Sequence, residues 1–199
     1  MFYKTSEPHG LPHNPFKAIV APRPIGWIST LDSKGAPNLA PYSFFNGVCD
    51  DPMILMFASG GMKDSAQNVA DTGEFTFNYV SRSLKDEMNL SSSSVEAGVN
   101  EFELAGLETA PGVTVACPRV RVAAAAMECK LLEIVNPTTL SGSKAPYFLV
   151  LGEVTGIYID DEMITPEGRF DTMKADPILR SGYHDYVCLD ELFELIRPT

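Results

Sequence analysis

The chain has 199 residues with 15 basic and 26 acidic side chains, which give a formal net charge of −11 at pH 7. Nucleic acids bind clustered lysine and arginine, so a protein this acidic is not expected to bind them. The length fits one domain over residues 1–199, and no apolar run approaches the roughly 20 residues that span a bilayer.

Metal and dithiol motifs are absent from the sequence. The four cysteines form no Cys-x-x-Cys pair, and the three histidines lack the spacing typical of metal ligands. We therefore expect buried thiols and no metal centre. The N-terminal segment has neither the basic start nor the apolar core of a secretory signal, which predicts a cytoplasmic protein.

Short segments of strand character, most of them bounded by Pro, Gly, Asn or Asp, recur along the chain. We expect strands over residues 16–20, 25–31, 38–43, 53–58, 74–80, 120–135 and 147–159. Helices are expected to be few and short, over residues 65–72, 81–90 and 189–195. Asp64 and Ser65 are candidate N-caps for the first helix, and Gly73 is a candidate left-handed stop. This pattern predicts a mainly β, antiparallel barrel with short flanking helices.

Arg23 stands between two prolines, just before the strand expected over residues 25–31. Pro22 and Pro24 stiffen the backbone on both sides of it, which suits an arginine that binds an anion. The strand over 25–31, a turn, and the returning strand over 38–43 follow directly. Together these segments are predicted to form one half of a ligand groove.

A second candidate site is the segment Ser59-Gly-Gly-Met-Lys63-Asp-Ser65, which leads from a strand through two glycines to a helix N-terminus. Backbone amides at the positive end of a helix, one ammonium group and one or two hydroxyls can hold a phosphate. The residue order matches neither the Walker A loop nor the Gly-x-Gly-x-x-Gly dinucleotide fingerprint. An ordinary capped helix is the alternative interpretation.

Several of these motifs occur in the order in which one known family has them. They are Arg23-Pro-Ile-Gly-Trp-Ile-Ser-Thr30, Asn38 to Asn46, Asp51-Pro52, Lys63-Asp-Ser65, Asn68, Gly73-Glu-Phe75, Leu151 to Val154 and Arg180 to Val187. Through them the chain resembles the flavin reductase-like family of FMN-binding split-barrel proteins, which includes the flavoredoxins. The resemblance implies a six-stranded antiparallel split barrel with Greek-key topology, a homodimer, and FMN with its phosphate on the Lys63-Asp-Ser segment.

An isoalloxazine ring needs a flat slot with apolar walls and main-chain donors and acceptors. Strands 25–31 and 38–43 and the residues after them offer this mixture, although Phe44 and Phe45 are also typical core residues. Short polar side chains on these apolar strands have no evident reason to be buried without a ligand. These are Ser29, Thr30, Ser43 and Asn46.

The C-terminal segment adds one more candidate. The matching segment of the family closes over the flavin, sometimes from the second subunit, although an arginine such as Arg180 is by itself typical of the surface. His184 receives no role, because hydride transfer to a flavin requires no protein acid or base. The candidate cofactor-binding residues are Arg23, Trp27, Ile28, Ser29, Thr30, Tyr42, Ser43, Phe44, Asn46, Ser59, Lys63, Asp64, Ser65, Asn68 and Arg180.

The resemblance implies a flavoprotein oxidoreductase in which FMN takes electrons from NADH or NADPH and passes them to a flavin or a partner acceptor. No fingerprint for a nicotinamide nucleotide is visible in the sequence. Two alternatives therefore stay open: a non-enzymatic FMN electron carrier, and a split-barrel interaction module that binds haem or no cofactor. The electron acceptor and the preferred nicotinamide nucleotide do not follow from the sequence.

Overall fold

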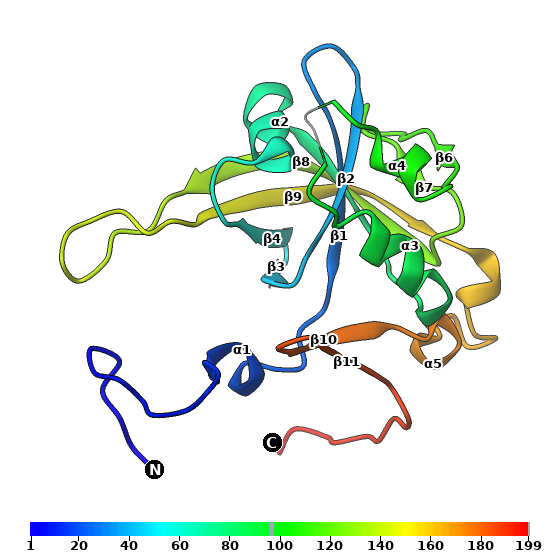
Figure 1. Cartoon of the computed structure of the whole chain (residues 1–199). Helices are drawn as coiled ribbons and strands as arrows, with labels where there is room; N and C mark the ends of the chain where they lie inside the picture. The colour runs from blue at the N-terminus through cyan, green and yellow to red at the C-terminus, as the bar shows by residue number, and fades with distance from the viewer. Residues whose placement is uncertain (96–97, 199) are drawn as a thin grey trace.

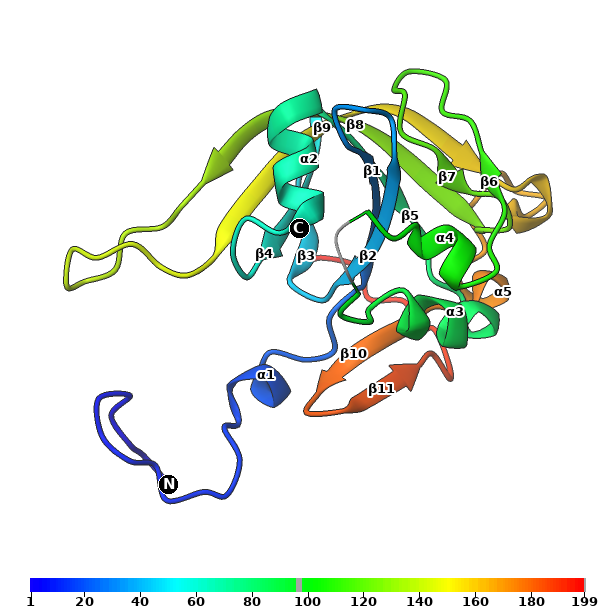
Figure 2. The ribbon, with the colours of Figure 1, turned by 45° about the horizontal axis from the view of Figure 1, so that its top comes forward.

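The computed structural model describes residues 1–95 and 98–198. Its main feature is one curled antiparallel sheet with few short helices around it (Figures 1 and 2). In spatial order its seven strands are β2 (Pro37–Tyr42), β1 (Gly26–Leu31), β5 (Glu74–Asn78), β8 (Ala125–Val135), β9 (Phe148–Ile159), β4 (Met53–Ser59) and β3 (Phe45–Asp50). The predicted mainly β, antiparallel class is confirmed, and the expected count of six strands is one too low.

Within the main sheet, the strand that the sequence did not predict is β3. Asn, Gly and Asp are depleted in strands, and this segment contains Asn46, Gly47 and Asp50. Its pairing with β4 is irregular between Gly47 and Cys49. β3 forms by pairing with β4, which follows it after only Asp51 and Pro52, and the strand propensity of its own residues does not reveal this pairing.

The β1–β2 hairpin was predicted, and its turn explains why it forms. Asp32 Oδ1 accepts hydrogen bonds from the Lys34 and Ala36 amides at 2.8 Å each, and Gly35 adopts φ +85°. β5 pairs with the other side of β1, so β1 lies inside the sheet while β2 is an edge strand. The outer side of β2 is therefore open to other groups.

The helices only partly follow the sequence prediction. They are α1 (Phe16–Ile19), α2 (Asp64–Thr72), α3 (Lys85–Leu90), α4 (Glu101–Leu104) and α5 (Thr172–Ala175), with 3₁₀ turns at Arg82–Leu84 and Asp161–Met163. Gly73 ends α2 at φ +75°, as predicted. The strand expected over 16–20 is instead α1, and the helix expected over 189–195 does not form.

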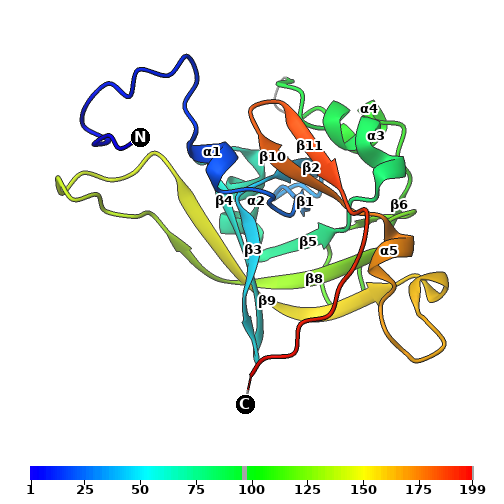
Figure 3. The same cartoon turned by 90° about the horizontal axis from the view of Figure 1, so that it is seen from below.

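Two small sheets complete the fold: β6 (Thr109–Ala110) with β7 (Arg119–Val120), and β10 (Ile178–Gly182) with β11 (Asp185–Cys188). The β10–β11 hairpin lies beside α1 (Figure 3), below the main sheet in the view of Figure 1. The contact is close, because a Cβ added at Gly182 would lie 2.6 Å from Ala18 Cα. The C-terminal hairpin and the N-terminal segment are thus brought together beside the β1–β2 hairpin.

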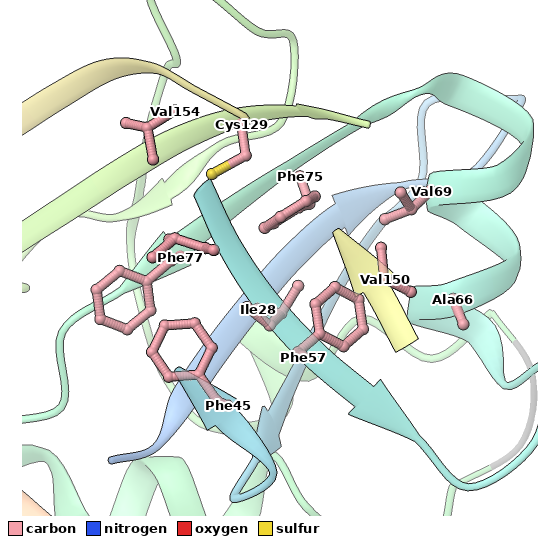
Figure 4. Packing of buried hydrophobic residues seen from close by; sticks show 11 residues of the cluster. Ile28, Phe45, Phe57, Ala66, Val69, Phe75, Phe77, Cys129, Val150 and Val154 are labelled. Carbon is pink, nitrogen blue, oxygen red and sulfur yellow. The ribbon is translucent and has the colours of Figure 1, made fainter. Parts of the chain in front are cut away.

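The sheet encloses an aromatic core (Figure 4). The rings of Phe45 and Phe77 stack with centroids 4.7 Å apart, and Phe57 meets Phe75 edge-on at 5.4 Å. A Cβ at Gly152 would lie 2.3 Å from the Phe75 ring, so this position requires glycine. A second cluster around Trp27 joins β1 and β2 to α3, α4 and β7.

Of the four cysteines, Cys117 and Cys129 are buried, whereas Cys49 is exposed and Cys188 is half-buried, so the expectation of four buried thiols is wrong for two of them. Among the described residues no cluster of three or more His, Cys, Asp or Glu side chains could hold a metal ion. Within the same residues, no helix is long and apolar enough to cross a bilayer.

Candidate functional site

A cavity of about 370 Å³ lies where the open edge of β2 meets the N-terminus of α2. Lys63, Asp64 and Ser65 line one side of it, Ala40 to Tyr42 of β2 another, and the serine run Ser91 to Ser94 after α3 a third. The cavity thus brings the predicted phosphate segment together with the predicted second strand. The serine run was not expected here, although four consecutive hydroxyls were a visible signal.

The N-terminus of α2 is open to a ligand. The N-cap residue is Lys63, in extended conformation, and its side chain makes no capping hydrogen bond within the described chain, so Asp64 and Ser65 are not the caps that the sequence predicted. Helix N-termini leave their first amides without partners inside the helix. The Lys63 and Asp64 side chains are both exposed. An ammonium group and free amides therefore meet at one corner of the cavity, which is a favourable place for an anion.

A buried polar network fixes this corner to β2. Glu101 of α4 accepts hydrogen bonds from Asn38 Nδ2 at 3.0 and 3.1 Å and from the Leu39 amide at 3.0 Å. Asn38 Oδ1 in turn accepts a hydrogen bond from Ser65 Oγ at 2.7 Å. Neither Asn38 nor Glu101 was among the predicted site residues, because nothing local marks two residues that meet from distant parts of the chain.

Tyr42 of β2 forms an aromatic wall of the 370 Å³ cavity. Burial raises the pKa of its phenol, and the nearby Ser65 and Ser59 hydroxyls partly oppose this. Its ring lies 4.8 Å from that of Phe57 in the core. Ser59 Oγ is buried and has no hydrogen-bond partner among the described residues, so a polar group next to Tyr42 is left unsatisfied there.

Four predicted residues of β1 lie in the interior instead of facing the cavity. Trp27, Ile28, Ser29 and Thr30 are all fully buried. Trp27 Nε1 donates to Ser91 Oγ at 2.9 Å, which holds the serine run in place. The strand therefore supports the cavity from behind.

The polar side chains of β1 find partners within the protein. Ser29 Oγ donates to the Pro118 carbonyl at 2.5 Å, and Thr30 Oγ1 accepts from Asn68 Nδ2 at 3.0 Å. The argument that these side chains need a ligand is therefore wrong for Ser29 and Thr30, because distant segments satisfy them. Asn68 lies on α2, and its side-chain amide also has a partner within the protein, because it donates to Thr30.

Arg23 is buried, with 7% of its surface exposed. Its Nε donates to the Ser43 carbonyl at 3.1 Å, and its Nη1 contacts the carbonyls of Lys17 and Val20. The guanidinium thus ties α1 to the end of β2. A contact between Arg23 and a cofactor stays a prediction.

The remaining predicted residues border two other cavities. Phe44 and Asn46 line an apolar cavity of about 700 Å³ with Met56 and Tyr147, and Asn46 itself is exposed. Arg180 lines a cavity of about 140 Å³ with Arg23 and Ser43. The predicted set is therefore divided among three neighbouring cavities, the interior of β1, and two further buried positions, Ser59 on β4 and Asn68 on α2.

A family model described as the flavin reductase like domain matches residues 20–174. The chain belongs to this family. An uncharacterized protein of Aquifex aeolicus is 36% identical over 174 residues, which are 85% of each chain. Among solved structures, nitrilotriacetate monooxygenase component B from Bacillus cereus has a TM-score of 0.86 at 26% identity and covers 98% of both chains. The 2-nitrobenzoate 2-nitroreductase NbaA of Pseudomonas fluorescens has a TM-score of 0.83 at 28% identity, over 100% of this chain and 97% of its own.

Against this family background, the donor set of the 370 Å³ cavity fits a flavin mononucleotide. The Lys63 ammonium and the open amides of α2 match one phosphate. The serine run and Ser65 supply hydroxyls for a polyol chain, and Tyr42 supplies an aromatic wall.

Proposed function

We propose that the protein is an FMN-dependent oxidoreductase of the flavin reductase type, which uses NADH or NADPH to reduce FMN and passes the electrons to a flavin or a partner acceptor. The observation that carries this proposal is the uncapped N-terminus of α2 with Lys63, facing a hydroxyl-lined cavity at the open edge of β2. Family membership and two oxidoreductase neighbours support the same class of reaction.

The phosphate of FMN would be held by the Lys63 ammonium and the first amides of α2. Asp64 would contribute its backbone N–H, because its carboxylate repels a phosphate. Ser65 keeps its orientation through Asn38, so its hydroxyl position is set before any ligand arrives. One phosphate cradle and no second glycine-rich loop favour FMN over FAD.

The outer edge of β2 would bind the ring. Leu39 bonds outward to Glu101, so by the alternation of an antiparallel strand the carbonyls of Leu39 and Pro41 also point away from β1. Pro41 has no N–H, which leaves an acceptor-rich edge. Bound FMN supplies the redox chemistry, and the protein supplies orientation and a polar environment.

The first test is the visible absorption spectrum of the purified protein, followed by chromatography of the heat-released cofactor. We expect a yellow protein that releases FMN. Release of FAD alone, or no flavin after reconstitution with excess FMN, would contradict the proposal and favour an interaction module without flavin.

Steady-state oxidation of NADH and NADPH, with free flavin as acceptor, tests the reductase activity. The non-enzymatic electron carrier is the second candidate, because no dinucleotide fingerprint is present in the sequence. Tight FMN binding without steady-state oxidation of NADH or NADPH would favour this electron carrier. The homodimer and the cytoplasmic location remain predictions, and light scattering of the purified protein tests the first.

A further inference from the structure

Arg23 and Arg180 face one another across a backbone bridge outside the main sheet. Each residue donates its amide hydrogen to the other's carbonyl, at 2.9 Å in both directions. Like charges directly opposite each other on paired strands are destabilising. Burial, and then the charge of Arg180, lower the pKa of Arg23. The fold thus holds two cations together at a cost.

The two arginines line the cavity of about 140 Å³ together with Lys17 of α1. None of the described residues that line it carries a carboxylate. Within the described part of the chain, the ion pairs involve other cations such as Arg82 and Arg121, and none involves these three. Three uncompensated cations around one cavity are unusual in a chain with a net charge of −11.

Both guanidinium groups are held in place by the protein while keeping free donors. Arg23 uses Nε and Nη1 for main-chain carbonyls, and among the described residues its Nη2 has no hydrogen-bond partner. Arg180 contacts the Tyr183 carbonyl and lies 4.6 Å from the centroid of the Tyr186 ring. A guanidinium fixed in this way loses little side-chain entropy when it binds an oxyanion.

The cavity also has a defined position relative to the proposed flavin site. Pro41 of β2 lines both the 140 Å³ cavity and the 370 Å³ cavity that contains Lys63. The two sites are therefore neighbours along the same strand edge. A second ligand that contacts a flavin bound at β2 could therefore extend into the 140 Å³ cavity, because Pro41 borders both cavities.

We propose that Lys17, Arg23 and Arg180 form a second anion site that binds the diphosphate group of the nicotinamide dinucleotide substrate, separate from the cradle for the FMN phosphate. This rests on the proposed function. Each of the two guanidinium forks can bind one of the two phosphate groups of the dinucleotide, which carry one negative charge each, and the ammonium group adds a third cation. The dinucleotide fingerprint is then unnecessary, because side-chain cations replace the glycine-rich loop.

Inorganic pyrophosphate, titrated calorimetrically into the FMN-loaded protein, tests the site without requiring turnover. We expect saturable binding to the wild-type protein and competition by NADH or NADPH. Arg180→Gln should weaken pyrophosphate binding about ten- to a hundredfold, the typical effect of one charge-assisted contact. Lys17→Gln, on an exposed side chain that leaves the fold intact, should weaken it by a smaller factor.

The matched control is Arg121→Gln, which removes the same charge from an exposed arginine paired with Glu108. It should leave pyrophosphate affinity unchanged. In turnover, Arg180→Gln should raise the KM for NAD(P)H with little change in kcat, because the diphosphate is bound equally in the ground and transition states. The affinities for FMN and riboflavin should not change, in contrast to the expectation from the sequence that Arg180 binds the cofactor.

Three results would overturn the inference. The first is wild-type protein that does not bind pyrophosphate at physiological salt. The second is an Arg180→Gln variant that loses affinity for FMN but not for riboflavin, which would place the FMN phosphate in this cavity. The third is pyrophosphate binding that NADH and NADPH do not compete with, which would assign the site to a free anion. Failure of the proposed function would give a different result. The wild-type protein would then bind no flavin or show no turnover, while it still bound pyrophosphate and Arg180→Gln still weakened that binding.

Discussion

Asn38 of β2 donates its side-chain amide to both carboxylate oxygens of Glu101 on α4, at 3.0 and 3.1 Å. Both residues are buried, and Leu39 adds a third hydrogen bond to the same carboxylate. A buried charge needs such partners, because leaving it unpaired costs several kcal/mol. This pair closes the outer edge of β2 on one side of the proposed cofactor cavity.

The pair predicts how the protein responds when the amide and the carboxylate are exchanged. Asn38→Asp would place a second carboxylate against Glu101 and remove its donors, so the free energy of unfolding should fall by at least about 1–3 kcal/mol at pH 7. Urea denaturation measures this. Adding Glu101→Gln should restore much of the loss, because the amide introduced on α4 can then donate to the carboxylate introduced on β2. Equal stability of the single and double variants would show that the pair is not coupled.

Lys63 is expected to recognise the phosphate of FMN. Lys63→Gln should weaken FMN binding roughly ten- to a hundredfold while riboflavin, which has no phosphate, binds as before. Fluorescence titration of the apoprotein with each ligand measures both affinities. Lys34→Gln, on an exposed turn lysine, is the control for net charge. An equal loss for both ligands would place Lys63 away from the phosphate.

Gly182 combines a positive φ with a close contact. Its φ is +106°, and a Cβ at this position would lie 2.6 Å from Ala18 Cα. Gly182→Ala should therefore destabilise the protein by more than about 1 kcal/mol. It should also separate the tip of the β10–β11 hairpin from α1. Gly35→Ala is the matched control, because Gly35 has φ +85° and open space around its Cα. If both variants lose the same stability in urea, the contact with α1 contributes nothing.

Glu128 should make stability depend on pH in the acid range. Burial alone would raise its pKa, but hydrogen bonds from the Thr114 hydroxyl and from the amides of Thr114 and Val113 outweigh it, and the net pKa is lowered. A lowered pKa in the folded state stabilises the protein above the unfolded pKa of about 4.3, and this contribution disappears as the pH falls through the folded value.

Unfolding of Glu128→Gln in urea should therefore vary less between pH 7 and acid pH than unfolding of the wild type. Glu133→Gln, on an exposed residue of the same strand, should keep the wild-type dependence. An unchanged acid dependence in Glu128→Gln would assign that dependence to other carboxylates.

The cysteines should differ in reactivity. Burial raises the pKa of the Cys117 thiol to about 12 and raises that of Cys129 as well, so neither forms thiolate at neutral pH. Titration of the native protein with a disulfide reagent should label Cys49 first and half-buried Cys188 more slowly, with all four reacting in denaturant. Cys49→Ser should remove the fast phase. Rapid labelling of Cys117 would contradict its burial.

Some site elements were predictable because their signals are local. The β1–β2 hairpin follows from its turn residues, and the end of α2 follows from Gly73. Other elements were not. The segment 189–195 has apolar residues at helical spacing, but its apolar side chains from Leu192 onward are exposed, so no packing supports a helix there.

The sequence by itself determined the family, the antiparallel class and the position of the Lys63 segment at a helix N-terminus, because turn residues, strand alternation and helix stops act over a few neighbouring positions. Only the tertiary structure decided which polar groups line a cavity and which are satisfied within the protein. Ser29 and Thr30 are satisfied from within, while Glu101 meets Asn38 and Arg180 meets Arg23 from distant parts of the chain. Partners of buried polar groups are set by long-range packing, and no local pattern encodes them.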